Sequence, residues 1–301
     1  MAKAAPKANR KKGGKFFFLS GDFWAHTFFK VLIAVLVCVG GWMLISMARD
    51  RCVKFSDFQV SPQTLELLAK PRWVRGPIEK QLKVVPGADG KVSLLDPAAT
   101  RKIASGLAAN PWVKEVKSVK REFPNRVRAE VSLRDPAAFV LRGNSYYIVD
   151  AEGVRLPGEY KDRADTGLDL LIISYVRTSP PPAGKVWDDP AVVEGARVAA
   201  FLKPHADVIK AARVAAIDTS NIGGRRTPRE PEIVLITAGH TQVYWGRGVH
   251  YPGSTELSPA RKLENLKAVL RQEGSLTDKE YVDLRFPNPV FRDRKFYLSS
   301  L

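Results

Sequence analysis

The stretch 110-NPWVKEVKSVKREFPNRVRAEVSLRDPAA-138 decides the fold, because it reads as two β-strands joined by a tight turn. From Arg126 to Arg134, apolar residues alternate with charged or polar ones. This alternation is typical of a sheet with one buried face and one wet face. In the preceding strand, Trp112 to Phe123, the apolar positions fall at intervals of three, so we expect a bulge or a strong twist there.

An amphipathic helix comes before this strand pair and is expected to cover its apolar face. Asp96 is predicted as the N-cap and Pro97 as the first helical residue. The helix should end at Asn110-Pro111. Its apolar positions share one face: Ala99, Ile103 and Leu107.

A second domain is expected after Asp135-Pro136, because proline interrupts the hydrogen bonding of a strand. It should contain a hairpin whose turn is 150-DAEG-153. Two helices are predicted, one from Asp189-Pro190 to about Pro204 with an apolar face, and one from Ser258-Pro259 to Gly274. The residues of the first face are Val193, Ala196 and Ala200, and the later strands are 233–236, 242–245 and 280–286.

The run from Val31 to Ala48 is 18 residues without a charge, which is long enough to cross a bilayer as a helix. Seven of the first 30 residues are Lys or Arg against one Asp, and short basic leaders stay in the cytoplasm. We therefore expect a basic cytoplasmic tail over 1–27, a transmembrane helix over 28–48, and the rest of the chain outside the cytoplasm. Two alternatives stay open: a signal peptide cleaved after Ala48, and a buried core helix.

The composition of the 301 residues, 45% of them hydrophobic, permits packed domains outside the membrane. The cysteines, Cys38 and Cys52, are separated by ~20 Å along a helix, so they do not bridge each other. The formal net charge is +17. A basic exterior indicates anionic surroundings such as lipid headgroups or cell-wall polymers, with a merely solvated basic surface as the alternative.

The sequence offers no support for catalysis. The four histidines have no spacing typical of a zinc site, and no nucleophile motif or phosphate-binding glycine loop is present. We predict no catalytic, metal-binding or cofactor-binding residues and no nucleic-acid partner.

The quoted stretch resembles the end of the POTRA domain in the bacterial cell-division family FtsQ/DivIB. The shared features are a Pro-Trp-Val strand start, a basic strand, a proline turn, an alternating strand and an Arg-x-Pro-x-Ala exit. Further similar motifs follow in the family's order: 147-YIVDAEGV-154, 243-VYWG-246, Lys262-Leu263 and 281-YVDLRF-286. Together they cover most of the chain.

The resemblance implies an α+β fold: a single N-terminal transmembrane helix, a small POTRA-like domain over 53–135, and a larger C-terminal β domain over 136–301. The first domain would place helices on a short mixed sheet, and the second would have a mainly antiparallel sheet. Members of the family are not enzymes. They are single-pass scaffolds of the bacterial inner membrane that link early and late division proteins at the septum and help control septal peptidoglycan synthesis.

The resemblance also implies a partner site. The strand ending at Arg285 and Phe286, continuing through Asn288, is expected to be an exposed edge that receives a segment of the FtsB/FtsL subcomplex by β-augmentation. Phe286 would be the aromatic anchor and Arg285 a charged contact, with an ordinary core aromatic as the alternative for Phe286. Other division proteins would contact the POTRA-like region. The rival interpretations are a POTRA-bearing translocation or secretion component and a cell-wall-binding envelope protein.

Overall fold

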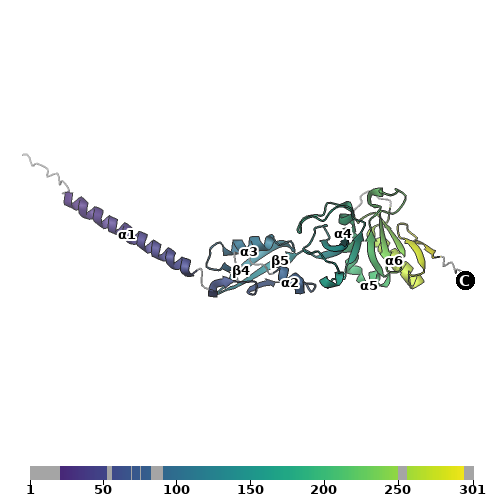
Figure 1. Ribbon diagram of the computed structural model, residues 1–301, viewed down its shortest axis with the longest axis horizontal. Coiled ribbons are helices and arrows are strands. Elements are labelled where there is room, and N and C mark those ends of the chain that lie inside the picture. The colour runs from purple at the N-terminus through teal and green to yellow at the C-terminus, as the bar shows by residue number, and fades with distance from the viewer. Residues whose placement is uncertain are drawn as a thin grey trace, which may run out of the picture. The chain divides into compact units, whose positions relative to one another are not determined.

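The computed structural model describes residues 21–52, 56–68, 70–74, 76–82, 91–249 and 256–294 (Figure 1). The chain divides into two compact units, residues 1–56 and residues 57–301. The first unit holds one long helix, and the second holds three sheets and the remaining helices.

Helix α1 spans Gly21–Cys52. Its segment Phe28–Cys52 has a mean hydropathy of 2.5 and none of it is buried, and it is the one helix among the described residues that is long and apolar enough to cross a membrane. Large side chains such as Trp42 and Leu44 are exposed along it. Contiguous apolar surface of this kind is unfavourable in water, and a lipid bilayer would bury it. The helix runs four residues past the predicted end at position 48, through Arg49 and Arg51.

The second unit begins with a small mixed sheet, called here the N-terminal sheet, whose strand order is β2-β5-β4. β2 is parallel to β5, and β4 is antiparallel to it. Helices α2 and α3 contribute buried residues to the same core as these strands. The bounds are β2 Leu65–Leu68, α2 Gly76–Leu82, α3 Ala99–Ala108, β4 Val113–Glu122 and β5 Arg126–Leu133, with a separate pair formed by β1 Gln59–Val60 and β3 Val92–Ser93.

The quoted stretch folds as the sequence predicts. β5 buries Val127, Ala129 and Val131 and exposes the residues between them to different degrees. β4 shows two register shifts against β5, which confirms the expected irregularity. The predicted cap of α3 is wrong, because Asp96 accepts a hydrogen bond from the amide of Ala98, just before the helix, at 2.8 Å.

The C-terminal sheet has eight strands in the order β13-β12-β11-β10-β9-β8-β6-β7. Four neighbouring pairs are antiparallel, and the pairs β6/β8, β8/β9 and β11/β12 are parallel. The expected α+β architecture is confirmed. The strands are β6 Pro136–Arg142, β7 Ser145–Asp150, β8 Leu171–Ser174, β9 Val214–Asp218, β10 Ile233–Thr237, β11 Gln242–Gly246, β12 Lys279–Asp283 and β13 Val290–Asp293.

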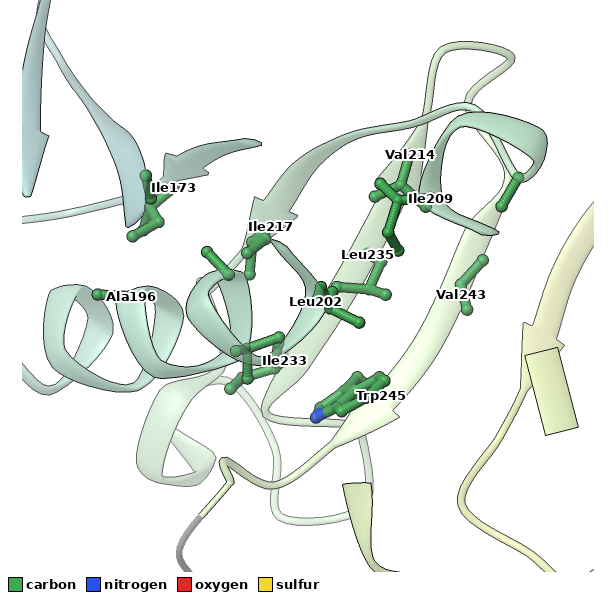
Figure 2. Close-up of a cluster of buried hydrophobic side chains, with 14 of the residues drawn as sticks. Ile173, Ala196, Leu202, Ile209, Val214, Ile217, Ile233, Leu235, Val243 and Trp245 are labelled. Carbon is green, nitrogen blue, oxygen red and sulfur yellow. The ribbon is translucent and has the colours of Figure 1, made fainter. Parts of the chain in front are cut away.

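Three helices pack with this sheet: α4 Pro190–Leu202, α5 Ala206–Ala211 and α6 Pro259–Glu273. Figure 2 shows Leu202 of α4 among inward-pointing strand residues such as Leu235 and Trp245. The predicted caps are confirmed, since Asp189 caps the start of α4, Ser258 caps the start of α6, and Gly274 is the C-cap of α6. The buried face of α4 is turned from the predicted one, because Val193 and Ala200 are half-buried while Val192 and Ala199 are buried.

The predicted chain reversal at 150–153 is present, but its return segment pairs through isolated antiparallel bridges, such as that between Val149 and Arg155, and forms no regular strand. Asp150 closes this turn, because its carboxylate accepts the amides of Glu152 and Val154. The longer hairpin is β6–β7, with its turn at Gly143-Asn144. Within this sheet, the strands β6, β8, β9 and β13 were not predicted.

Candidate protein-binding interface

β13 is the outermost strand at one end of the C-terminal sheet. It pairs with β12, and no other strand among the described residues pairs with its far side. Three of its four residues, Val290, Arg292 and Asp293, are exposed, and Phe291 is half-buried. An edge of this kind presents backbone amides and carbonyls that can pair with another chain.

The expected position of the edge is therefore wrong by one strand. β12 ends at Asp283 and is paired on both sides, in parallel with β11 and antiparallel with β13. The reason is the turn that contains Pro287 and Pro289, which brings the chain back so that residues 290–293 lie along β12. The signal for β13 in the sequence is short, the pair Val290-Phe291 after these prolines.

Two of the three predicted site residues lie exposed in this turn beside the edge. The side chain of Phe286 is 52% exposed, so it is not a core aromatic. Asn288 is also exposed. The backbone of the turn is held from α6, because Asn265 Nδ2 donates to the carbonyl oxygen of Phe286 at 2.8 Å.

Arg285 is already engaged within the chain. Its guanidinium donates to the carboxylate of Asp283, with Nη2 2.7 Å from Oδ2 and Nε 2.9 Å from Oδ1. These hydrogen bonds raise the pKa of Arg285. Its guanidinium carbon also lies 5.5 Å from the ring centre of Phe286, within the range of a cation–π contact. The arrangement fixes Arg285 beside Phe286 before any partner arrives.

The other end of the β12–β13 hairpin contains a buried lysine. Lys279 Nζ lies 2.7 Å from Glu273 Oε2 and 2.6 Å from Asp293 Oδ1. Hydrogen bonds to Asp293 and to Glu273 raise the pKa of Lys279. The hairpin is thus tied to α6 at both of its ends.

The N-terminal sheet also has open edges, and β4 forms one of them. β4 pairs with β5, and no strand of the described chain pairs with its far side. A groove of about 580 Å³ runs between α3 and this edge. Its lining includes Thr100 and Ala104 from the helix, and Lys117 and Val119 from the strand.

Within the described residues, no three His, Cys, Asp or Glu side chains gather in a group that suits a metal ion. The features that stand out are the open strand edges, among them those of β13 and β4, in a chain with one candidate membrane span among its described residues. These features define a protein that has one candidate membrane helix and sheet edges able to pair with another chain.

Comparison with known proteins identifies the family. The family model for the C-terminal domain of cell division protein FtsQ/DivIB matches residues 138–285. The cell division protein FtsQ of Koribacter versatilis (strain Ellin345) is 30% identical over 125 residues, which cover 41% of this chain and 34% of that protein. The aligned part thus spans about a third of the relative's length.

Residues 138–285 of the chain belong to the FtsQ/DivIB family of cell division proteins, as the motifs predicted. The family is a non-enzymatic family of cell division proteins, and the match points to protein partners in division. With α1, the chain has the form of a single-pass membrane protein.

Proposed function

We propose that this protein is a scaffold of the bacterial divisome that catalyses no reaction itself. It links early and late division proteins through contacts outside the cytoplasm and helps control septal peptidoglycan synthesis. The basic leader supports a cytoplasmic N-terminus, with the folded unit 57–301 on the other side of the inner membrane at the septum. The rival functions, in translocation or in cell-wall binding, gain no support from the family match.

The observation that carries the proposal is the open edge of β13 next to the exposed ring of Phe286. A segment of an FtsB/FtsL-type partner would add to β13 as a ninth strand, because backbone hydrogen bonds supply affinity without a deep pocket. Phe286 would anchor it, since exposed aromatics that become buried dominate many interfaces. Arg285 and Asn288 would contribute polar contacts from the same turn.

Phe286→Ala should lower the affinity for the FtsB-type protein of the same bacterium by at least ~10-fold, and Phe286→Glu should lower it further. The measurement is binding of the two full-length proteins reconstituted in lipid nanodiscs. Phe123→Glu is the matched control, because Phe123 is 64% exposed and lies in the turn between β4 and β5. Unchanged affinity in both folded Phe286 variants would remove this residue from the interface.

Direct evidence for strand addition would come from hydrogen exchange. The amides of residues 290–293 should exchange more slowly in the complex than in the free protein, since the partner's backbone would pair with them. Protection elsewhere on the molecule, with none in β13, would contradict strand addition.

A second contact is proposed at the edge of β4, in the region expected to resemble a POTRA domain. The groove between α3 and β4 leaves room for the side chains of an added strand. Lys117 and Arg101 line it, so an acidic extended segment of another division protein is the fitting occupant.

Filling this groove tests the second contact. Ala104→Trp should reduce septal recruitment of an N-terminal fluorescent fusion at least ~2-fold, because the indole would occupy the groove. Ser105→Trp, one residue further along α3 on an exposed position, is the control. Normal recruitment of the Ala104 variant at equal expression would contradict a contact in this groove.

A further inference from the structure

β13 has little to hold it in the sheet. It has four residues, and Phe291 is the one that packs, partly buried, against the core of the C-terminal sheet. A strand with so few buried apolar contacts frays readily. A frayed strand makes a poor template, because a partner would have to order it before pairing with it.

One buried ammonium joins this strand to two other elements. The side chain of Lys279, the first residue of β12, is 4% exposed. It contacts Glu273, the last residue of α6, and Asp293, the last residue of β13. Its Nζ also lies 4.9 Å from the ring centre of Phe291. The ammonium is shielded from solvent within its own side chain's surroundings, so it depends on these carboxylates staying in place.

The adjoining backbone strengthens this end of the hairpin. The amide of Arg294 donates to the carbonyl oxygen of Asp278 at 2.7 Å, and its guanidinium donates to the carbonyl oxygen of Gly239 at 2.9 Å. Thr241 Oγ1 donates to the carbonyl oxygens of Leu276 and Lys279. The strand β12 and the residue after β13 are therefore both fixed where Lys279 lies.

The turn at the opposite end is held by a neutral side chain of the same helix. Asn265 Nδ2 lies 2.8 Å from the carbonyl oxygen of Phe286 and 3.4 Å from that of Leu284. Eight residues separate Asn265 from Glu273, or ~12 Å along α6. This distance is close to the ~13 Å length of a four-residue strand.

We infer that α6 is a brace for the edge hairpin: Asn265 holds the turn that carries Phe286, and Glu273 holds β13 through Lys279. Asn265 and Lys279 are positioning residues that keep the edge ordered before a partner binds. The inference deepens the proposed function of β13, but the brace itself exists in the free protein. It is therefore testable without any partner.

Hydrogen exchange of the free full-length protein tests the brace. Lys279→Met keeps the length of the side chain and removes the charge, and Asn265→Asp keeps the shape and removes the donor. Each should speed exchange of the β12–β13 amides by at least ~10-fold and leave the β9–β10 amides unchanged. Lys267→Met and Asn144→Asp are the matched controls, because Lys267 forms an exposed pair with Glu264 and Asn144 lies in an exposed turn.

A double variant shows whether Lys279 acts through β13. If Lys279 and Asp293 work as a pair, Lys279→Met with Asp293→Asn should exchange no faster than Lys279→Met alone. The brace is overturned if exchange in β12–β13 stays at the wild-type rate in both single variants. It is also overturned if exchange rises equally throughout the sheet, which would indicate general destabilisation.

Binding of the FtsB-type protein separates this inference from the proposed function. If both hold, Lys279→Met weakens binding although Lys279 is buried and offers no surface to a partner. If exchange changes as expected but the wild-type protein binds no FtsB-type partner, the brace stands and the proposed function fails.

Discussion

At the scale of single residues, Asp189 shows how one buried carboxylate organises several groups. Its side chain is 1% exposed. One oxygen accepts the amide of Ala191 at the start of α4, and the other accepts the hydroxyl of Thr178 at 2.9 Å. Burial alone would disfavour ionisation, but the hydrogen bonds from Ala191 and Thr178 outweigh it and lower the pKa of Asp189.

Asp189→Asn should lower the free energy of unfolding by ~1–2 kcal/mol near neutral pH, because a charged acceptor at the helix N-terminus is replaced by a neutral amide. The native pKa is lower than the unfolded one, so this stabilisation is present above about pH 4 and is lost as the pH falls through the native pKa. Denaturant unfolding of both proteins at about pH 7 and about pH 3 measures the difference, which should shrink in acid.

Asp162→Asn is the control, since Asp162 caps a short exposed turn and should matter far less. Equal stability of wild type and Asp189→Asn at both pH values would show that the buried carboxylate contributes nothing to the native state.

At the scale of elements, the packing of α4 against the sheet depends on a glycine. Gly195 of α4 faces Ile173 of β8, and a Cβ placed on Gly195 would lie 3.1 Å from three side-chain carbons of Ile173. Ile173 is fully buried. The helix therefore reaches the sheet only because position 195 has no side chain.

Gly195→Ala sets two effects against each other. Alanine favours the helix by ~1 kcal/mol, whereas overpacking a core costs ~1–3 kcal/mol. Since Ile173 has no exposed side to move toward, we expect a net loss of about 1 kcal/mol in the free energy of unfolding. Chemical denaturation measures it.

The companion variant Ile173→Val identifies the cause. If the clash with Ile173 is responsible, Gly195→Ala should cost less in the Ile173→Val background than in the wild type. Purely additive effects would point to some other source of the loss.

Among the helices and strands, the sequence predicts those that have local signals and misses the others. Helix ends carry local signals, so Asp189, Ser258 and Gly274 mark the ends of α4 and α6 correctly. β4 and β5 are also predicted, because the alternation of β5 and the proline turn before it are local signals within 25 residues. β8 and β13 have four residues each, too few for a periodic pattern, and β8 pairs in parallel with strands remote in sequence.

Part of the candidate site can likewise be predicted from the sequence, and part of it cannot. The exposed turn residues Phe286 and Asn288 can be proposed from a motif and the residues after it. Which strand forms the edge depends on the order of all eight strands, and no local pattern states that order. Asn265 and Lys279 give no signal in the sequence, because their roles arise from contacts across 14 to 21 residues.

At the scale of the whole unit 57–301, the two larger sheets share a core. Val127 and Trp112 of the first part belong to one buried cluster with Phe139, Ile148 and Leu156 of the second. Beside this cluster, Arg134 Nη1 lies 2.8 Å from Asp150 Oδ2. The predicted boundary at Asp135 thus lies where packing continues from one sheet to the next, and the division into domains at this residue stays a prediction.

The position of α6 between β11 and β12 bears on how the molecule is made. Since synthesis proceeds from the N-terminus, β11 is the edge strand at this end of the sheet until α6 and β12 have left the ribosome. β13 can dock only after β12 has done so. A partner that pairs with β13 therefore cannot bind a chain whose sheet is still incomplete. Binding at β13 selects molecules in which all eight strands of the C-terminal sheet have formed.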